Sequence, residues 1–347
     1  MLKNLSFILV IIIFCSCSGN KTSAQNSNSF NKFGQEVDSK PEFYLHLTNN
    51  QANKMYLYED LLVIRNTKQT AKNFFFNIYN LKTRKLADSQ FKMGGEANEI
   101  LSPLATGLNN NLLWAYDISA SKVAVQPLKQ TLANHKNKEF KINALMYAMQ
   151  LADTLQAFVN GDYSKSSKVQ LINLATGKIV KELGNYGETP KGVNQVTWRN
   201  ANENFLFLQP KGQALVSAYR FTDKIEIFNL STGKSKVISG PENYQPEFNE
   251  AKLGSNNYRA ERNEKTKFAF VNGCVTNQYI YLLYSGNNHM SENLDYGKAI
   301  FVYNWNGKPI EKINLPSYIS CFTVKNDKEA YVFEVKDSSI KKIDLNL

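Results

Sequence analysis

Short apolar segments alternate with polar turns through most of the chain. From Glu42 onwards, runs rich in Val, Ile, Tyr and Phe recur, and each is broken by Gly, Asn, Asp, Ser or Lys. Patterns with the period of an amphipathic helix are rare in this part of the chain. This arrangement predicts many short β-strands joined by turns, and therefore an all-β protein.

A strand that ends in asparagine and runs into a short polar turn occurs four times. The asparagines that begin these turns are Asn80, Asn173, Asn229 and Asn304. In three of the four turns a Gly-Lys pair follows, and glycine supplies the positive φ that a tight turn needs. The asparagine side chain can accept a hydrogen bond from the backbone two residues further on. Each of these four sequence motifs, which are called phrases below, therefore predicts a β-hairpin.

The hairpin phrase repeats with a period. Two weaker copies, at residues 121–125 and 340–345, bring the number to six. The strands before the turns are centred near Tyr79, Val123, Ile172, Phe228, Tyr303 and Ile343. Most intervals are close to the roughly 40–50 residues of a propeller blade, and the long one contains an insertion at about 240–267. Because a lone blade leaves its faces uncovered, six units predict a six-bladed β-propeller over residues 41–347. A two-domain β-sandwich accounts for the strands but not for the recurring phrase.

The N-terminus has the pattern of an export signal. One basic residue, Lys3, precedes an apolar run at 7–14 that is shorter than the roughly 20 residues of a membrane-spanning helix. The residues before Cys17 resemble a lipoprotein lipobox, with Ser16 directly before the cysteine and Phe14 three positions before it. The resemblance implies a signal peptide at 1–16 and lipidation of Cys17. Plain secretion is the alternative.

Residues 17–40 are rich in Ser, Asn, Lys and Gln and poor in large apolar side chains. Such a composition cannot bury a core, so the lipidated cysteine is expected to be followed by a flexible tether. No acidic run follows Cys17. In some Gram-negative envelopes such a run helps to route lipoproteins to the cell surface. We therefore expect the outer membrane, facing the periplasm, with the cell surface as the alternative.

Composition excludes several classes of protein. With 43% hydrophobic and 20% charged residues and four Cys, the chain is neither wholly disordered nor a disulfide scaffold. Lys and Arg number 41 against 30 Asp and Glu, which gives a net charge of +11. Nucleic acid is not an expected partner of an exported protein, so the charge favours contact with anionic lipid or lipopolysaccharide. Cys274 and Cys321 are expected to be buried strand positions, and sequence alone leaves a disulfide between them open.

The sequence contains no recognisable set of catalytic residues. His46, His135 and His289 lie far apart, and none has a second metal ligand at the required spacing. No nucleophile elbow, P-loop or dinucleotide-binding fingerprint is present. We therefore assign no catalytic residue and expect no metal and no cofactor.

One loop is a candidate interaction site. The insertion before the fifth repeat contains basic and aromatic side chains that could meet phosphate or acidic glycans, and these are Tyr258, Arg259, Arg262 and Lys265. A solvated loop, with Glu261 and Glu264 offsetting its charge, is the simpler interpretation.

Three stretches resemble a known family. They are the Gly-Gly-Glu of residues 94–96, the Tyr-Ser-Gly of 284–286 and the Tyr-Asn-Trp-Asn-Gly-Lys-Pro of 303–309. They are similar to motifs of the TolB-like six-bladed propeller lipoproteins of Bacteroidetes-type bacteria, over about residues 43–347. The family's first motif carries a proline that this chain lacks. The resemblance implies the propeller fold and a location in the bacterial envelope. It assigns no catalytic residue.

Three functions remain open at this point. We expect first a monomeric, lipid-anchored, non-enzymatic module that offers a rim or its axial funnel to a protein, peptide or glycan. The second is a hydrolase or lyase with an axial site, possibly metal-dependent, which requires carboxylates and a histidine to converge at the channel mouth. The third is a small-ligand sensor, which requires a deep pocket with a few convergent polar groups.

Overall fold

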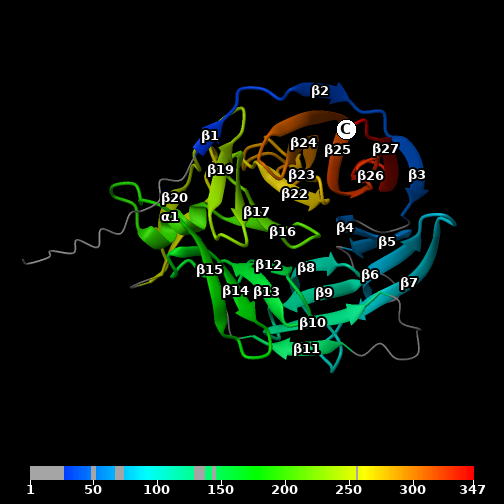
Figure 1. Ribbon diagram of the computed structural model, residues 1–347, viewed down its shortest axis with the longest axis horizontal. Coiled ribbons are helices and arrows are strands. Elements are labelled where there is room, and N and C mark those ends of the chain that lie inside the picture. Colours follow the sequence, from blue (N-terminus) through cyan, green and yellow to red (C-terminus); the bar gives the residue numbers. More distant parts are fainter. Residues whose placement is uncertain (1–26, 48–51, 67–73, 129–136, 143–145, 255–256) are drawn as a thin grey trace, which may run out of the picture.

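Six four-stranded antiparallel blades surround a central axis, as the hairpin repeat predicts (Figure 1). The computed structural model describes residues 27–47, 52–66, 74–128, 137–142, 146–254 and 257–347. Neighbouring innermost strands pack side by side around the whole ring, and the last of them, in β25, packs against the first, β4. The six-bladed propeller is therefore confirmed, and the β-sandwich alternative is wrong.

The first three blades follow one another along the chain, each running from the axis outwards. Blade 1 is β4 (Ala52–Tyr58), β5 (Leu61–Asn66), β6 (Phe74–Asn80) and β7 (Lys85–Lys92). Blade 2 is β8 (Pro103–Asn109), β9 (Leu112–Asp117), β10 (Lys122–Pro127) and β11 (Lys138–Lys141). Blade 3 is β12 (Ala148–Leu151), β13 (Gln156–Asn160), β14 (Ser167–Asn173) and β15 (Ile179–Asn185).

The last three blades include one strand that serves two of them. Blade 4 is β16 (Asn204–Leu208), β17 (Ala214–Tyr219), β18 (Lys224–Asn229) and β19 (Ser235–Ser239). Blade 5 is β22 (Phe270–Val275), β23 (Tyr279–Tyr284), β24 (Gly297–Asn304) and the first part of β25 (Pro309–Lys325). Blade 6 is the second part of β25, β26 (Glu329–Glu334), β27 (Ser339–Asp344) and β3 (Glu42–His46).

The repeated asparagine phrase joins the third and fourth strands of four blades. In each copy the asparagine Oδ1 accepts two backbone N–H groups of the turn, for example those of Ala175 and Thr176 onto Asn173, both at 3.0 Å. Asn80, Asn229 and Asn304 do the same in their own turns. The glycines that follow have φ of 68°, 71° and 77° at Gly177, Gly233 and Gly307. The local hairpin prediction is confirmed in the four copies that contain the asparagine.

The N-terminal segment runs along the outside of three blades (Figure 1). The strand β1 (Ser27–Ser29) pairs in parallel with β19, and β2 (Gln35–Asp38) pairs in parallel with β25. The strand β3 then pairs antiparallel with β27 and completes blade 6. Between β1 and β2, Phe33 is 3% exposed and its ring lies 4.8 Å from that of Phe301. Residues 27–40, which the sequence analysis assigned to the tether, are thus held against the propeller, and 1–26 lie outside the described residues.

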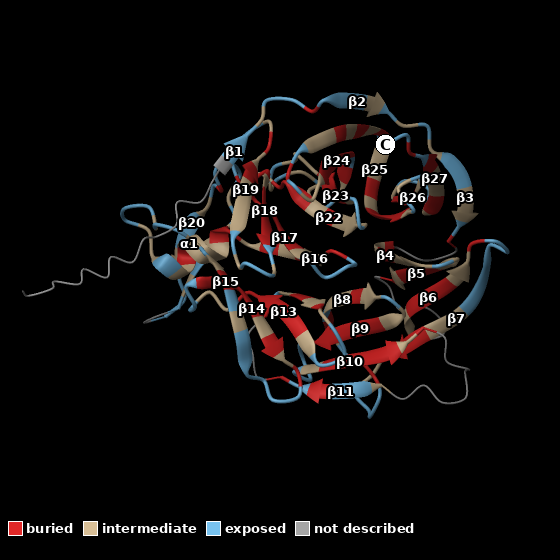
Figure 2. Cartoon of the chain, in the orientation of Figure 1, coloured by how far each residue is buried: buried red, intermediate tan, exposed pale blue. Residues whose placement is uncertain are grey.

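Apolar packing lies mainly between blades. The described residues form six clusters of buried apolar side chains, one at each blade interface, and Figure 2 shows the buried segments along the middle of the strands. Representative pairs from these clusters, from the interface of blades 1 and 2 round to that of blades 6 and 1, are Val63 and Leu113, Trp114 and Val159, Val169 and Leu215, Val216 and Leu282, Ile300 and Phe322, and Phe333 and Leu62. Strands covered on both faces read as near-continuous apolar runs, which explains the sequence pattern.

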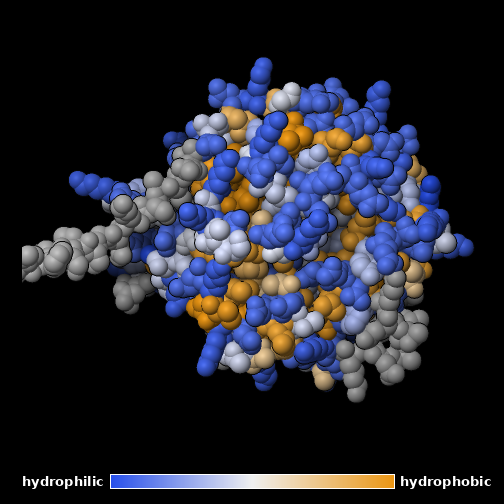
Figure 3. Space-filling model, viewed as in Figure 1, coloured by the Kyte–Doolittle hydropathy of each residue, from blue (hydrophilic) through white to orange (hydrophobic). Residues whose placement is uncertain are grey.

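The long interval of the repeat contains an insertion between blades 4 and 5, at the expected place. It includes a hairpin of β20 (Asn249–Lys252) and β21 (Tyr258–Glu261), which packs on α1 (Gln195–Ala201). The Ala260 N–H donates to Asn200 Oδ1 at 2.9 Å and fixes the hairpin to the helix. Hydrophilic side chains cover most of the face seen in Figure 3, with apolar side chains scattered among them.

Candidate functional site

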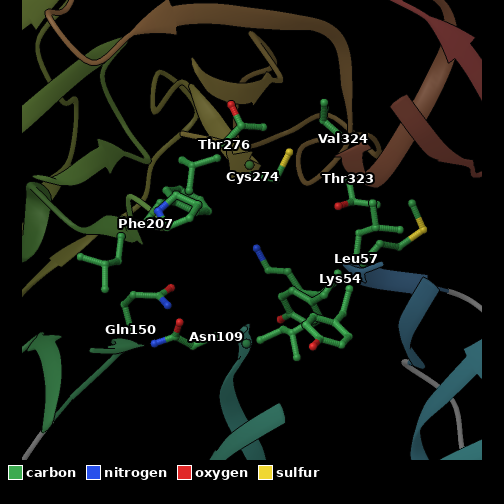
Figure 4. A pocket seen from close by; sticks show the side chains of 18 of the residues that line it. Lys54, Leu57, Asn109, Gln150, Phe207, Cys274, Thr276, Thr323 and Val324 are labelled. Carbon is green, nitrogen blue, oxygen red and sulfur yellow. The ribbon is translucent and has the colours of Figure 1, made fainter. Parts of the chain in front are cut away.

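A cavity of about 890 Å³ lies on the propeller axis. All six blades contribute to it, through the innermost strands β4, β8, β12, β16, β22 and β25 and the turns that follow them. This volume is within the range of cavities that enclose small molecules or the end of a larger ligand. Figure 4 shows side chains from every side of the ring directed into the space.

The ends of the innermost strands and the turns that follow them form the rim of the cavity, and the rim is rich in amides. The rim amides are Asn109, Asn110, Gln150, Asn277, Gln278 and Asn326. An amide side chain can both donate and accept hydrogen bonds, so this ring can meet the backbone of a peptide or the hydroxyls of a sugar. Asn109 Nδ2 already donates to the carbonyl oxygens of Leu151 and Ala152, so this residue offers its oxygen. Apolar side chains such as Leu57, Phe207 and Val324 line the wall below the rim.

Lys54 lies at the end of the cavity away from the rim. It is the first lining residue of β4, and its amine points into the space in Figure 4. The Nζ atom donates to Asn272 Oδ1 at 3.0 Å and lies 5.0 Å from the centre of the Phe205 ring. Among the described residues, no Asp or Glu carboxylate forms an ion pair with it.

The partner amide of Lys54 is held rigidly. Asn272 is 3% exposed, and its Nδ2 donates to the carbonyl oxygens of Asn53 at 3.0 Å and Ser320 at 2.9 Å. Its Oδ1 also accepts the N–H of Gly273 at 2.9 Å. Asn272 therefore ties together the innermost strands of blades 1, 5 and 6 and fixes the orientation of the oxygen that meets Lys54.

Burial lowers the pKa of the Lys54 amine from 10.5 to about 8, because the charged form loses its hydration. The positive charges of Arg65 and Arg220 contribute to this lowering of the pKa. Near neutral pH the amine is thus a cation that releases its proton more readily than an exposed lysine. A perturbed titratable group in a cavity is a physical marker of a functional site.

Arg65 is the second cation at this end of the cavity. One of its terminal nitrogens donates to the Pro103 carbonyl at 2.6 Å, while its buried Nε has no partner among the described residues. Beside it, the Tyr56 hydroxyl donates to the Thr106 carbonyl at 2.8 Å, and burial raises the pKa of that phenol to about 12. The end of the cavity away from the rim is therefore basic.

The carboxylates that line the cavity sit at the rim. Asp60 forms ion pairs with Lys82 at 2.6 Å and Lys325 at 2.8 Å, and the hydrogen bonds from these amines lower the pKa of its carboxyl to about 2. Asp327 accepts the Tyr281 hydroxyl at 2.8 Å. The cavity lining contains no described histidine, because His46 is exposed on β3 and His289 stacks on Phe268. His135 lies outside the described residues.

The predicted interaction loop borders a second cavity of about 430 Å³ near α1. Arg259 and Arg262 line it, whereas Tyr258 and Lys265 do not. Arg262 lies over two aromatic rings, 5.3 Å from that of Phe221 and 5.4 Å from that of Phe268. Arg259 is paired with Glu261 at 2.6 Å. The structure thus brings two of the four predicted residues together.

Both described cysteines are free thiols. Cys321 is buried and Cys274 is half-buried at the cavity wall, which agrees with their expected place in strands. Burial raises the pKa of both thiols, that of Cys321 to about 12. Cys17, the expected lipid attachment site, lies outside the described residues.

Two further features concern the described residues alone. They contain no group of three or more His, Cys, Asp or Glu side chains placed to hold a metal ion. None of their helices is both long and apolar enough to cross a bilayer.

Comparison with known proteins identifies the family. A family described as TolB-like 6-blade propeller-like matches residues 38–327. A Bacteroides vulgatus member of the DUF4221 family has 10% identity and a TM-score of 0.56, with 89% of this chain and 96% of that chain covered. A Bacteroides fragilis protein described as exported has 12% identity and a TM-score of 0.54, with coverage of 92% and 98%. No curated protein matches in sequence. The chain belongs to the TolB-like six-blade propeller family.

Proposed function

We propose that this protein is a lipid-anchored binding module of a bacterial envelope that receives part of a protein, peptide or glycan in its axial cavity. In this proposal Cys17 carries the lipid, and the propeller faces the periplasm from the outer membrane. The axial cavity is the observation that carries the binding function, because it joins a ring of amides, an apolar wall and one basic end in a single space.

The state of the polar groups supports binding rather than axial hydrolysis. Asp60 is engaged by two lysines, and Asp327 accepts the hydroxyl of Tyr281. The basic end holds Lys54 and Arg65, which can attract an anionic group, while the described carboxylates of the cavity lining lie at the rim and not beside them. Structural similarity to the two Bacteroides proteins supports the fold. The description of one of them as exported agrees with a location in the bacterial envelope.

The lipid anchor is tested by labelling with a fatty acid. We expect label on the full-length chain and its complete loss in the Cys17→Ala variant, because the sulfur that carries the diacylglycerol is gone. The matched control is Cys15→Ala, which lies two residues upstream and should keep both the label and the membrane fraction. Labelling that survives Cys17→Ala would contradict the anchor.

Binding at the cavity is tested by crosslinking in cells. A photoreactive amino acid replaces Gln278, which is exposed at the rim, or Leu86, which is 43% exposed on the outer strand β7. We expect a discrete crosslinked product from position 278 and none above background from position 86. Equal amounts of crosslinked product from both positions, or no product from position 278, would contradict the proposal.

A further inference from the structure

Two cations that lie between the described blades have a carboxylate beside them. Lys168 is paired with Glu226 at 2.6 Å, and Arg220 is paired with Glu203 at 2.7 Å. Lys54 and Arg65 differ, because neither forms an ion pair with any carboxylate of the described residues although both lie inside the ring. An uncompensated cation in such a place costs stability, so its retention points to a ligand that supplies the negative charge.

The hydrogen-bonding capacity at this end of the cavity is largely unused by the fold. A lysine ammonium has three donors, and in the described part of the chain the Lys54 amine gives one of them, to Asn272. Arg65 has five donors, and the one hydrogen bond it forms there goes to Pro103. Both side chains line the same space, so an anion could accept from two directions.

The rim selects for low ligand charge. Glu59, Asp60 and Asp327 line the side through which a ligand passes the amide ring. Lys82 and Lys325 offset the charge of Asp60, and the remaining acidic charge at the rim repels an anion in proportion to the charge of that anion. The aromatic face of Phe205 and the apolar wall further along also disfavour a dianion, whose desolvation costs more. A single carboxylate meets these limits better than a phosphate group.

The rest of the cavity fits an extended chain behind that carboxylate. The rim amides match the alternating donors and acceptors of a peptide backbone, and Leu57, Phe207 and Val324 offer contact to apolar side chains. We propose that the basic end of the axial cavity is a carboxylate subsite, in which Lys54 and Arg65 bind the C-terminal carboxylate of an extended peptide. This inference rests on the proposed binding function and names its ligand class.

The test uses the reactivity of Lys54 as its readout. The mature protein is treated with acetic anhydride at pH 8, and acetylation at Lys54 and at the exposed Lys211 is measured by mass spectrometry. The probes are two pools of N-acetylated tetrapeptides with random sequence, one with free C-terminal carboxylates and one with C-terminal amides. We expect the acid pool to lower acetylation of Lys54 at least tenfold, with no change at Lys211. The amide pool should change neither.

A second measurement uses variants. Retention of the acid pool on immobilised protein should fall at least tenfold for Lys54→Met, and Lys54→Arg should restore part of it because the cation remains. Equal protection by the two pools, or by acetate or inorganic phosphate alone, overturns the peptide carboxylate. Rim crosslinks in cells without protection by the acid pool would leave the binding module standing and reject this subsite.

Discussion

A variant that begins at residue 48 is expected to unfold at far lower denaturant concentration than the mature protein, or to show no cooperative transition. It lacks β3, so β27 loses its partner and blade 6 keeps three of its four strands. It also lacks Leu47, which is 1% exposed in the cluster between blades 6 and 1. Because a domain of this kind is stable by only about 5–15 kcal/mol, losing a closing strand removes a large part of that margin.

Staged truncations separate the closing strand from the rest of the segment. A variant that begins at residue 27 keeps β1, β2 and β3 and should match the mature protein. One that begins at residue 41 loses Phe33, whose removal alone should cost about 3–5 kcal/mol of unfolding free energy. Equilibrium unfolding in urea measures each step. Equal stability of the variants that begin at 41 and 48 would show that β3 does not close the ring.

Point substitutions give a matched check within the same segment. Leu47→Ala should cost about 2–5 kcal/mol, because it leaves a cavity in a packed interface. Phe43→Ala, four residues earlier, should change the free energy of unfolding by less than about 0.5 kcal/mol, since the ring is 64% exposed. Similar costs at the two positions would contradict the burial pattern of this strand.

The blades could be predicted from the sequence because their signal is local. An asparagine such as Asn173 and a glycine such as Gly177 shape the turn within a few residues, so the hairpin is readable without its surroundings. The pairing of β1 with β19 brings Ser27 beside Val237, and nothing in the polar sequence around Ser27 specifies that contact. The place of the N-terminal segment therefore depends on the finished propeller.

The candidate site was hidden for a similar reason. Lys54 stands in a strand between Asn53 and Met55, where a lysine would ordinarily face solvent. The role of Lys54 in the cavity depends on its contacts with Asn272 and Phe205, which lie in blades 5 and 4 and are far from it in sequence. The predicted loop was visible because its basic residues are close in sequence, and only Arg259 and Arg262 share a cavity.

Two buried lysines in this fold are expected to respond to the same substitution with opposite signs. The side chain of Lys168 is 7% exposed, and it meets Glu226, which is 0% exposed and also accepts hydrogen bonds from Tyr219 at 3.0 Å and Ser235 at 2.6 Å. Lys168→Met removes the ion-pair partner at 2.6 Å from this carboxylate at the interface of blades 3 and 4. We expect a loss of about 3–5 kcal/mol in the free energy of unfolding at pH 7.

The double variant Lys168→Met/Glu226→Leu is the control for that result. Replacing both charged groups by apolar ones also removes the buried carboxylate, so much of the lost stability should return. Urea unfolding of the wild type, the single variant and the double variant measures the difference. A single variant that loses less than about 1 kcal/mol would mean that the pair contributes little to the interface.

Lys54→Met is expected to stabilise the protein at pH 7, by about 1–3 kcal/mol, because it removes a cation that no described carboxylate offsets. Asn272 Oδ1 keeps the N–H of Gly273 as a partner in this variant.

The pKa of Lys54 is about 8 in the folded protein against an ordinary 10.5, so between these pH values the unfolded state binds more protons than the folded state. Wild-type stability therefore rises with pH in that window, and the advantage of the variant should be full below pH 8 and shrink towards pH 10.5. Urea unfolding at pH 7, 9 and 10.5 measures the difference in unfolding free energy between the variant and the wild type. A difference that stays constant with pH would show that the cavity does not disfavour the charged form of the amine.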